Sequence, residues 1–170
     1  MTLPTEKKSR RERIMARLNE LGSQGPKRSL GQNFLVADHV IDRILRAARE
    51  REVATAAIVE VGPGLGALTE DLRKISCKQF ILIELDRDFA GYWRSCALQV
   101  VEVDALRLDW EKLQLPPGSL LVSNLPYQIS SSLVIERSVQ PAGSERMVLM
   151  FQKEVAERIA AKPHSKAYGI

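Results

Sequence analysis

The chain has 170 residues, of which 45% are hydrophobic, and a formal net charge of +4. This length supports one domain with a hydrophobic core and is too short for two domains of ordinary size. No apolar run approaches the roughly 20 residues of a membrane-spanning helix, and the charged N-terminus lacks the apolar centre of a signal peptide. We therefore expect a soluble, cytoplasmic protein with no membrane segment.

The cysteines and histidines argue against a metal centre. Cys77 and Cys96 show no CxxC or Cys/His spacing, which favours reduced thiols. His39 and His164 are too few and too far apart in the sequence to suggest a ligand set. We expect no bound metal.

Positive charge is concentrated at the N-terminus. Residues 1–28 hold 8 Lys/Arg against 3 Glu, whereas the rest of the chain holds 17 Lys/Arg against 18 Asp/Glu. Such an arm either contacts phosphate groups or is a solvated tail. Ile14, Leu18 and Leu21 fall at helical spacing and predict a short amphipathic helix. We assign residues 1–26 to a basic N-terminal extension.

From residue 27 to 170, short apolar runs alternate with segments of helical spacing. The expected strands are rich in β-branched and aliphatic residues and cover 56–61, 79–85, 98–103, 119–124 and 146–151. The expected helices cover 40–45, 65–75, 89–97, 131–139 and the segment that begins at 152. Strands that are apolar on both faces and separated by helices indicate a parallel sheet covered on both sides, which is a doubly wound, Rossmann-like α/β domain.

The first expected strand leads into the glycine-rich sequence EVGPGLGALTE. Gly62, Gly64 and Gly66 allow a tight turn and close approach of a ligand to the backbone. The spacing of Gly62, Gly64 and Ala67 also satisfies the dinucleotide fingerprint GxGxxA. Glu84, at the end of the second strand, is placed to accept hydrogen bonds from both ribose hydroxyls of a bound adenosine. These features alone leave a nicotinamide or flavin enzyme open.

The third and fourth strands also end in polar residues. Asp104 can accept a hydrogen bond from an adenine amine or, alternatively, cap a helix. Asn124, Leu125, Pro126 and Tyr127 combine two acceptors, a stiff proline turn and an aromatic face. That combination suits a planar base carrying an amine, and an ordinary proline turn is the alternative. The strand ends share the carboxyl edge of the sheet, where ligands bind in open α/β folds.

The sequence SLGQNFL, residues 29–35, is a polar loop with an embedded phenylalanine directly before the first helix of the domain. We interpret this loop as a lid that closes over a ligand. A simple helix-entry loop is the alternative interpretation.

Seven segments in this order resemble a known family, the small-subunit ribosomal RNA adenine dimethyltransferases of the kasugamycin-sensitivity type: KRSLGQNFL, VEVGPGLGALT, IELD, VDAL, NLPYQISSSLV, QKEVAERI and HSKAYG. The resemblance covers residues 27–169. It implies a class I methyltransferase that uses S-adenosylmethionine to methylate N6 of two adjacent adenosines near the 3′ end of small-subunit (16S) ribosomal RNA. The implied partner is the pre-30S subunit, and the full-length protein is expected to be monomeric.

The resemblance assigns cofactor contact to eight residues: Gln32, Asn33, Leu35, Gly62, Gly64, Glu84, Asp104 and Asn124. In this assignment Glu84 holds the ribose, Asp104 holds the adenine of the cofactor, and Asn124 lies between the cofactor and the target base.

An adenine amine is a poor nucleophile, so we expect catalysis by orientation rather than by a general base. The Asn124 side chain and the Leu125 carbonyl would accept the two N–H bonds of the amine. Pro126 would fix the turn, and Tyr127 would stack on the base. These four residues are the predicted catalytic set.

Three other functions are compatible with parts of this pattern. They are a dinucleotide oxidoreductase, a large-subunit ribosomal RNA adenine methylase of the antibiotic-resistance type, and a non-catalytic RNA-binding assembly factor on the same fold. The resembling family has a seven-stranded sheet followed by a helical domain, whereas five strands are expected here. We therefore expect an incomplete sheet, no C-terminal helical domain, and weak or absent methylation by these 170 residues.

Overall fold

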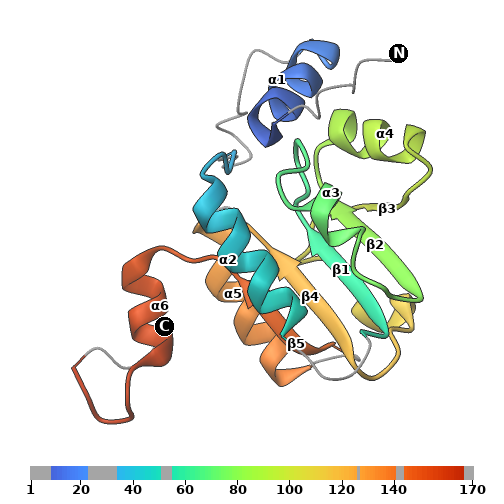
Figure 1. The fold of residues 1–170 in the computed structure, drawn as a ribbon. Coiled ribbons are helices and arrows are strands. Elements are labelled where there is room, and N and C mark those ends of the chain that lie inside the picture. The colour runs from blue at the N-terminus through green and yellow to red at the C-terminus, as the bar shows by residue number, and fades with distance from the viewer. Residues whose placement is uncertain (1–8, 23–33, 51–54, 126, 141–143, 167–170) are drawn as a thin grey trace.

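The computed structural model describes residues 9–22, 34–50, 55–125, 127–140 and 144–166. A parallel sheet of five strands in the order β3-β2-β1-β4-β5 forms its centre (Figure 1). The strands are Ala57–Val61 (β1), Gln79–Glu84 (β2), Gln99–Glu102 (β3), Ser119–Ser123 (β4) and Ser144–Leu149 (β5). All five expected strands and the doubly wound α/β class are confirmed, with boundaries that differ by one or two residues.

Six α-helices and one 3-10 helix are described. They are Arg10–Glu20 (α1), Asp38–Arg49 (α2), Thr69–Leu72 (α3), Arg87–Ser95 (α4), Tyr127–Val139 (α5), Lys153–Ala160 (α6) and the 3-10 helix Trp110–Leu113 (η2). The sequence pattern did not reveal η2. The amphipathic helix predicted from Ile14, Leu18 and Leu21 is confirmed as α1, which begins with a capping box between Ser9 and Glu12.

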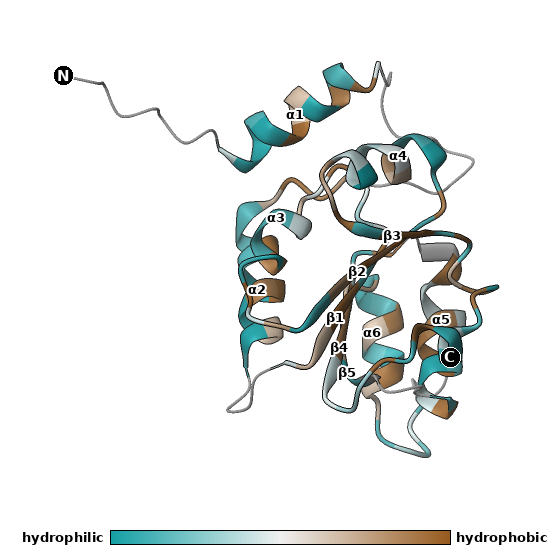
Figure 2. Ribbon diagram, turned by 90° about the vertical axis from the view of Figure 1, so that its right-hand side faces the viewer, coloured by the Kyte–Doolittle hydropathy of each residue, from teal (hydrophilic) through white to brown (hydrophobic). Residues whose placement is uncertain are grey.

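Hydrophobic cores lie on both faces of the sheet, as Figure 2 shows with the brown strands between α2 and α3 on one side and α5 on the other. Every residue of β1 and β4 is buried. On one face Ile41 and Leu45 of α2 pack over Ile58, and on the other Leu133 of α5 packs over Val59. Burial on both faces explains why these strands read as continuous apolar runs rather than alternating ones.

The helix predicted over residues 65–75 was wrong in extent, because only the four residues of α3 are α-helical. Gly66 has φ of +79°, a left-handed conformation that cannot be part of an α-helix. The chain therefore leaves β1 through a glycine loop, defined here as residues 62–68, before α3 begins. Conversely, α5 begins at Tyr127, four residues before the predicted start at 131.

The register of the sheet brings the carboxyl ends of its strands together. Val61 of β1 pairs with Ile83 of β2 and with Ser123 of β4. Glu84 comes directly after Ile83 on one side of Val61, and Asn124 comes directly after Ser123 on the other side. Within the described helices, none has the length and apolar character needed to cross a membrane.

Candidate functional site

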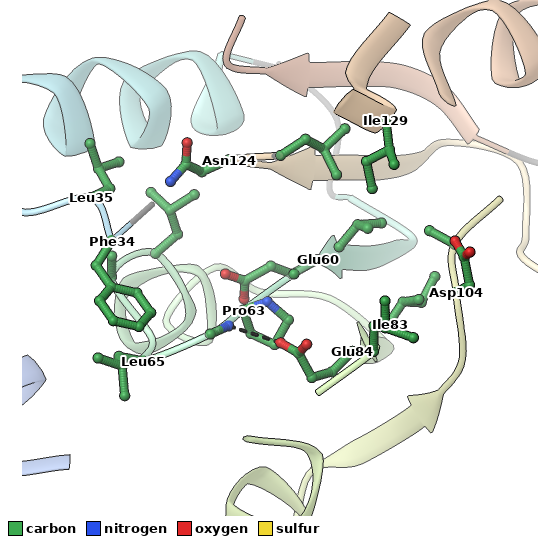
Figure 3. Close-up of a pocket in the computed structure, with 18 of the residues that line it drawn as sticks. Phe34, Leu35, Glu60, Pro63, Leu65, Ile83, Glu84, Asp104, Asn124 and Ile129 are labelled. Atoms are coloured by element: carbon green, nitrogen blue, oxygen red, sulfur yellow. Dashed lines mark hydrogen bonds between the residues drawn. The ribbon is translucent and has the colours of Figure 1, made fainter. Parts of the chain in front are cut away.

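A cavity of about 200 Å³ opens at the carboxyl edge of the sheet. Its walls come from the ends of β1, β2 and β4, from the glycine loop, from the turn after β3, and from the segment before α2 (Figure 3). Seven of the predicted site residues line this cavity: Leu35, Gly62, Gly64, Glu84, Asp104, Asn124 and Leu125. Residues that are far apart in the sequence thus share one hollow, as the strand-end argument predicted.

Four predicted residues cannot be placed in this way. Gln32, Asn33 and Pro126 lie outside the described residues. Tyr127 is the first residue of α5, and only its backbone is described.

The glycine loop is held by hydrogen bonds from several directions. The Gly62 amide donates to the Ile83 carbonyl at 2.8 Å, and the Gly66 amide donates to the Pro63 carbonyl at 2.8 Å. Gly62 has φ of +68°, and a Cβ built on it would meet no described atom within 4 Å. The backbone at Gly62 is therefore open to the cavity, which leaves room for a ligand to lie directly against it.

Glu84 connects the glycine loop to the second strand. Its side chain is only 5% exposed, and it accepts hydrogen bonds from the Gly64 amide at 3.1 Å and from the Asp86 amide at 2.8 Å. Burial raises the pKa of this carboxyl, while the backbone amides of Asp86, Gly64 and Leu85 act in the opposite direction. A carboxylate has about four lone-pair positions, so Glu84 retains acceptor capacity toward the cavity.

Glu60 is a site residue that the sequence analysis did not single out. It lies in β1, lines the same cavity, and is 2% exposed. Its Oε2 atom is buried and has no hydrogen-bond partner among the described residues. Burial raises the pKa of Glu60 to about 8; the nearby Thr69 side chain acts in the opposite direction, and the charge of Glu84 adds to the increase. An acid inside an otherwise apolar strand, AIVEV, was the signal that could have indicated it.

Figure 3 shows the carboxyl groups of Glu60 and Glu84 on the same side of the cavity beside Pro63. Two acids share a hollow whose other walls are largely apolar, including Leu35, Ile83 and Ile129. Such an arrangement favours a ligand that carries positive charge and hydrogen-bond donors, because a cation lowers the cost of ionising the buried Glu60.

Asp104 begins a turn rather than the helix that was one alternative for it, and its contact with a cofactor stays a prediction. It lies two residues after β3, and its Oδ1 atom accepts a hydrogen bond from the Leu106 amide at 3.0 Å, which stabilises a turn. The residue also lines the cavity, across from Asn124. The turn therefore orients the side chain while leaving its second oxygen for a ligand, apart from a long contact of 3.9 Å with Arg107.

Asn124 follows β4 and lines the cavity beside Leu35 (Figure 3). The strand end beneath it is fixed by Ser123, whose hydroxyl donates to the Val61 carbonyl of β1 at 2.5 Å. Leu125 is buried in the core on the α5 face. Rigid neighbours on both sides hold the Asn124 side chain at the edge where a second ligand could reach it.

The segment before α2 also contributes to the cavity. Phe34 and Leu35, the described end of the predicted lid, line the cavity, and the Phe34 ring packs edge-on against Phe89 of α4 with centroids 6.1 Å apart. Ile14 of α1 lines the cavity as well. This wall was not foreseen, because α1 lies in the N-terminal extension.

The strand order, the glycine loop after β1 and the acid at the end of β2 define a class I S-adenosylmethionine-dependent methyltransferase fold. Solved structures agree. The chain is 30% identical to a dimethyladenosine transferase from Plasmodium falciparum, with a TM-score of 0.65, over 80% of this chain and 49% of that one. It is 27% identical to the 23S rRNA methyltransferase ErmE, with a TM-score of 0.60, over 75% of this chain and 51% of that one.

The chain belongs to the ribosomal RNA adenine dimethylase family, whose family model matches residues 24–170. It is 51% identical over 160 residues to the ribosomal RNA small subunit methyltransferase A of Bdellovibrio bacteriovorus, a match that covers 94% of this chain and 57% of that relative. The chain thus spans little more than half the length of this relative. The family resemblance and the predicted fold class are confirmed.

Proposed function

We propose that these residues form the cofactor-binding part of a ribosomal RNA methyltransferase. The enzyme would transfer methyl groups from S-adenosylmethionine to N6 of two adjacent adenosines in the 3′-terminal hairpin of 16S ribosomal RNA, in the cytoplasm, during assembly of the small subunit. The observation that carries the proposal is the single cavity that joins Gly62, Glu84, Asp104 and Asn124 in a chain of this family.

The cavity fits the cofactor on three counts. The open backbone at Gly62 gives room for the methionine portion. The acceptor capacity left on Glu84 suits the ribose hydroxyls. The orphaned oxygen of Glu60 suits a positively charged group. When bound, S-adenosylmethionine supplies a methyl group on a positively charged sulfur.

The protein's own residues would then perform binding and orientation. Glu84 would hold the ribose, and the free oxygen of Asp104 would accept a hydrogen bond from the cofactor's adenine. The Asn124 side chain and the Leu125 carbonyl would hold the two N–H bonds of the target amine, and Tyr127 would stack on the target base. This arrangement presents the nitrogen lone pair in a fixed direction and needs no general base.

Calorimetric titration with S-adenosylmethionine of the wild-type chain and a Glu84→Gln variant tests the cofactor assignment. A charge-assisted hydrogen bond contributes roughly 1.5–3 kcal/mol, so the dissociation constant should rise roughly 10- to 150-fold. Glu102 provides a matched control, because it pairs in register with Glu84 on the neighbouring strand but does not line the cavity. Glu102→Gln should leave the affinity unchanged within about twofold. Equal affinity for all three proteins would remove Glu84 from the site.

Methyl transfer from labelled S-adenosylmethionine tests the reaction and its substrate. The acceptors would be under-methylated small subunits and a 23S ribosomal RNA fragment, and each would be offered to this chain and to a chain extended past Ile170. We expect label in adjacent adenosines of the small subunit, with the extended chain far more active. In the extended chain, Asn124→Ala should nearly abolish transfer and change cofactor affinity only a few fold. Label in the 23S fragment alone would overturn the substrate assignment.

A further inference from the structure

Arg17 is an unusual residue of the N-terminal extension, because it is only 7% exposed. All three nitrogens of its guanidinium are in use. Its Nε donates to the Tyr92 hydroxyl at 2.9 Å, Nη1 donates to the Leu65 carbonyl at 2.7 Å, and Nη2 donates to the Glu70 carboxylate. One side chain of α1 therefore binds α4, the glycine loop and α3 together.

Aromatic contacts reinforce this position. The Arg17 guanidinium carbon lies 4.9 Å from the centroid of the Trp93 ring, and the Trp93 indole N–H donates to the Gly64 carbonyl at 2.9 Å. Arg17 and Trp93 thus hold two successive carbonyl groups of the glycine loop, those of Leu65 and Gly64. Glu84, which lines the cavity, binds the Gly64 amide, so both polar groups of the Gly64 backbone are held by side chains.

Gly66 shows how closely these groups pack. A Cβ built on this residue would lie 2.5 Å from the Trp93 ring and 2.6 Å from Arg17 Nη1. Gly62 differs, because its Cβ direction is open. The third glycine of the loop is therefore required by the guanidinium and indole that press against it.

Ile14 lies one turn before Arg17 and is 3% exposed. It forms part of the cavity wall and packs in a small core with Leu65 and Phe89. At the start of the same helix, Arg10 makes ion pairs with three aspartates of α2 and α3 at 2.9–3.1 Å. Helix α1 is thus anchored at two points, with a wall residue of the cavity between them, and two charges of the basic extension are neutralised within the domain.

We propose that α1 is a part of the cofactor site in which Arg17 acts as a positioning residue for the glycine loop. The loop is held in a fixed conformation before the ligand arrives, which lowers the entropy lost on binding. Docking of α1 and binding of the cofactor then stabilise each other, because coupling between two sites is reciprocal. The identity of the ligand rests on the proposed function, whereas the positioning of the loop does not.

The test compares three variants of the whole chain, Arg17→Gln, Arg17→Lys and Arg11→Gln. Arg11 is the matched control, because it lies exposed on the same helix and its replacement removes the same charge. Amide hydrogen exchange without ligand reports on the loop through the Gly64 and Gly66 amides, and titration with S-adenosylhomocysteine reports on binding. Exchange in β1 and β4 shows whether the domain remains folded. Arg17→Lys keeps the charge but cannot bind three partners at once. If Arg17→Gln fails to fold, Arg17→Lys alone tests the positioning role.

We expect Arg17→Gln to speed amide exchange in the glycine loop at least tenfold and to lower the affinity for S-adenosylhomocysteine at least tenfold. Arg17→Lys should give values between those of Arg17→Gln and the wild type in both measurements. Arg11→Gln should match the wild type within twofold in both measurements. In the wild type, saturating S-adenosylhomocysteine should slow exchange in α1, which a purely structural anchor would not produce.

Unchanged loop exchange in both Arg17 variants would overturn the positioning role. Faster loop exchange with unchanged affinity would overturn the coupling to the ligand. If the wild type binds neither S-adenosylhomocysteine nor S-adenosylmethionine, the proposed function fails and the coupling fails with it, while loop exchange still decides the positioning role.

Discussion

Replacing Glu60 with glutamine changes how the stability of the domain depends on pH. The buried carboxyl has a pKa of about 8 in the folded protein, because burial and the charge of Glu84 disfavour ionisation, against an ordinary value of 4.5. Below pH 4.5 the carboxyl is protonated in both states and costs nothing. Between pH 4.5 and 8 only the unfolded chain releases the proton, so the free energy of unfolding falls as the pH rises.

The size of the effect follows from the same two values. Each pKa unit corresponds to about 1.4 kcal/mol, so the full loss of stability above pH 8 is about 5 kcal/mol. Water that enters the cavity beside the ionised carboxylate reduces this figure, and we expect a measured loss of at least about 2 kcal/mol. Glutamine has nearly the same shape and does not ionise. Relative to wild type, Glu60→Gln should therefore be similar in stability at pH 5 and clearly more stable at pH 9.

Urea denaturation of both proteins at pH 5, 7 and 9, at constant ionic strength, measures this difference. The contributions of titrating groups that do not interact with Glu60 cancel when the wild-type curve is subtracted from the variant curve. A difference that grows by at least about 2 kcal/mol from pH 5 to pH 9 supports the account. If the free energies of unfolding of the two proteins change with pH in parallel, Glu60 is ionised at little cost, and the reasoning from its burial is wrong.

Three further outcomes are expected. S-adenosylmethionine should bind wild type more tightly as the pH rises from 6.5 to 8, because the cation favours ionised Glu60, and titration of Glu60→Gln should show a flatter profile. Gly66→Ala should lower the free energy of unfolding by roughly 2–4 kcal/mol in urea denaturation, because its Cβ has no room and its φ is +79°. Gly91→Ala on α4, where a Cβ is unobstructed, should be neutral or stabilising. In an extended chain, Tyr127→Phe should keep methyl transfer and Tyr127→Ala should lose most of it, and equal loss in both would show that the hydroxyl, not stacking, matters.

The sheet could be predicted because its signal is local. The five residues of β1 and the five of β4 are buried on both faces, so each strand is marked in the sequence by an uninterrupted apolar run between polar turns. The convergence of Gly62, Glu84, Asp104 and Asn124 also followed from this pattern, since the ends of parallel strands meet at one edge.

The parts that escaped prediction depend on contacts between distant residues. Arg17 was counted as one charge of a basic extension, because nothing near it in the sequence reveals a carbonyl 48 positions and a tyrosine hydroxyl 75 positions away. The pKa of Glu60 likewise depends in part on the charge of Glu84, which lies near Glu60 only because β1 pairs with β2. The short α3 escaped for a related reason, because helical spacing does not show that Gly66 takes a left-handed conformation.

The packing of Arg17 and Trp93 against Gly66 has a consequence for how this family evolves. No Cβ fits at position 66 while either large side chain presses on it, so both Arg17 and Trp93 would have to become smaller before the space opened. Substitutions at these three positions should therefore be correlated among relatives. A residue other than glycine at 66 should be rare, because φ there is +79°, and should occur only where both the arginine and the tryptophan have been replaced. A relative in which α1 is missing would lose the contact with Arg17 but keep the contacts with Trp93 and the left-handed backbone at Gly66. Residues 17, 66 and 93 should therefore vary together among relatives, although they lie in different parts of the chain.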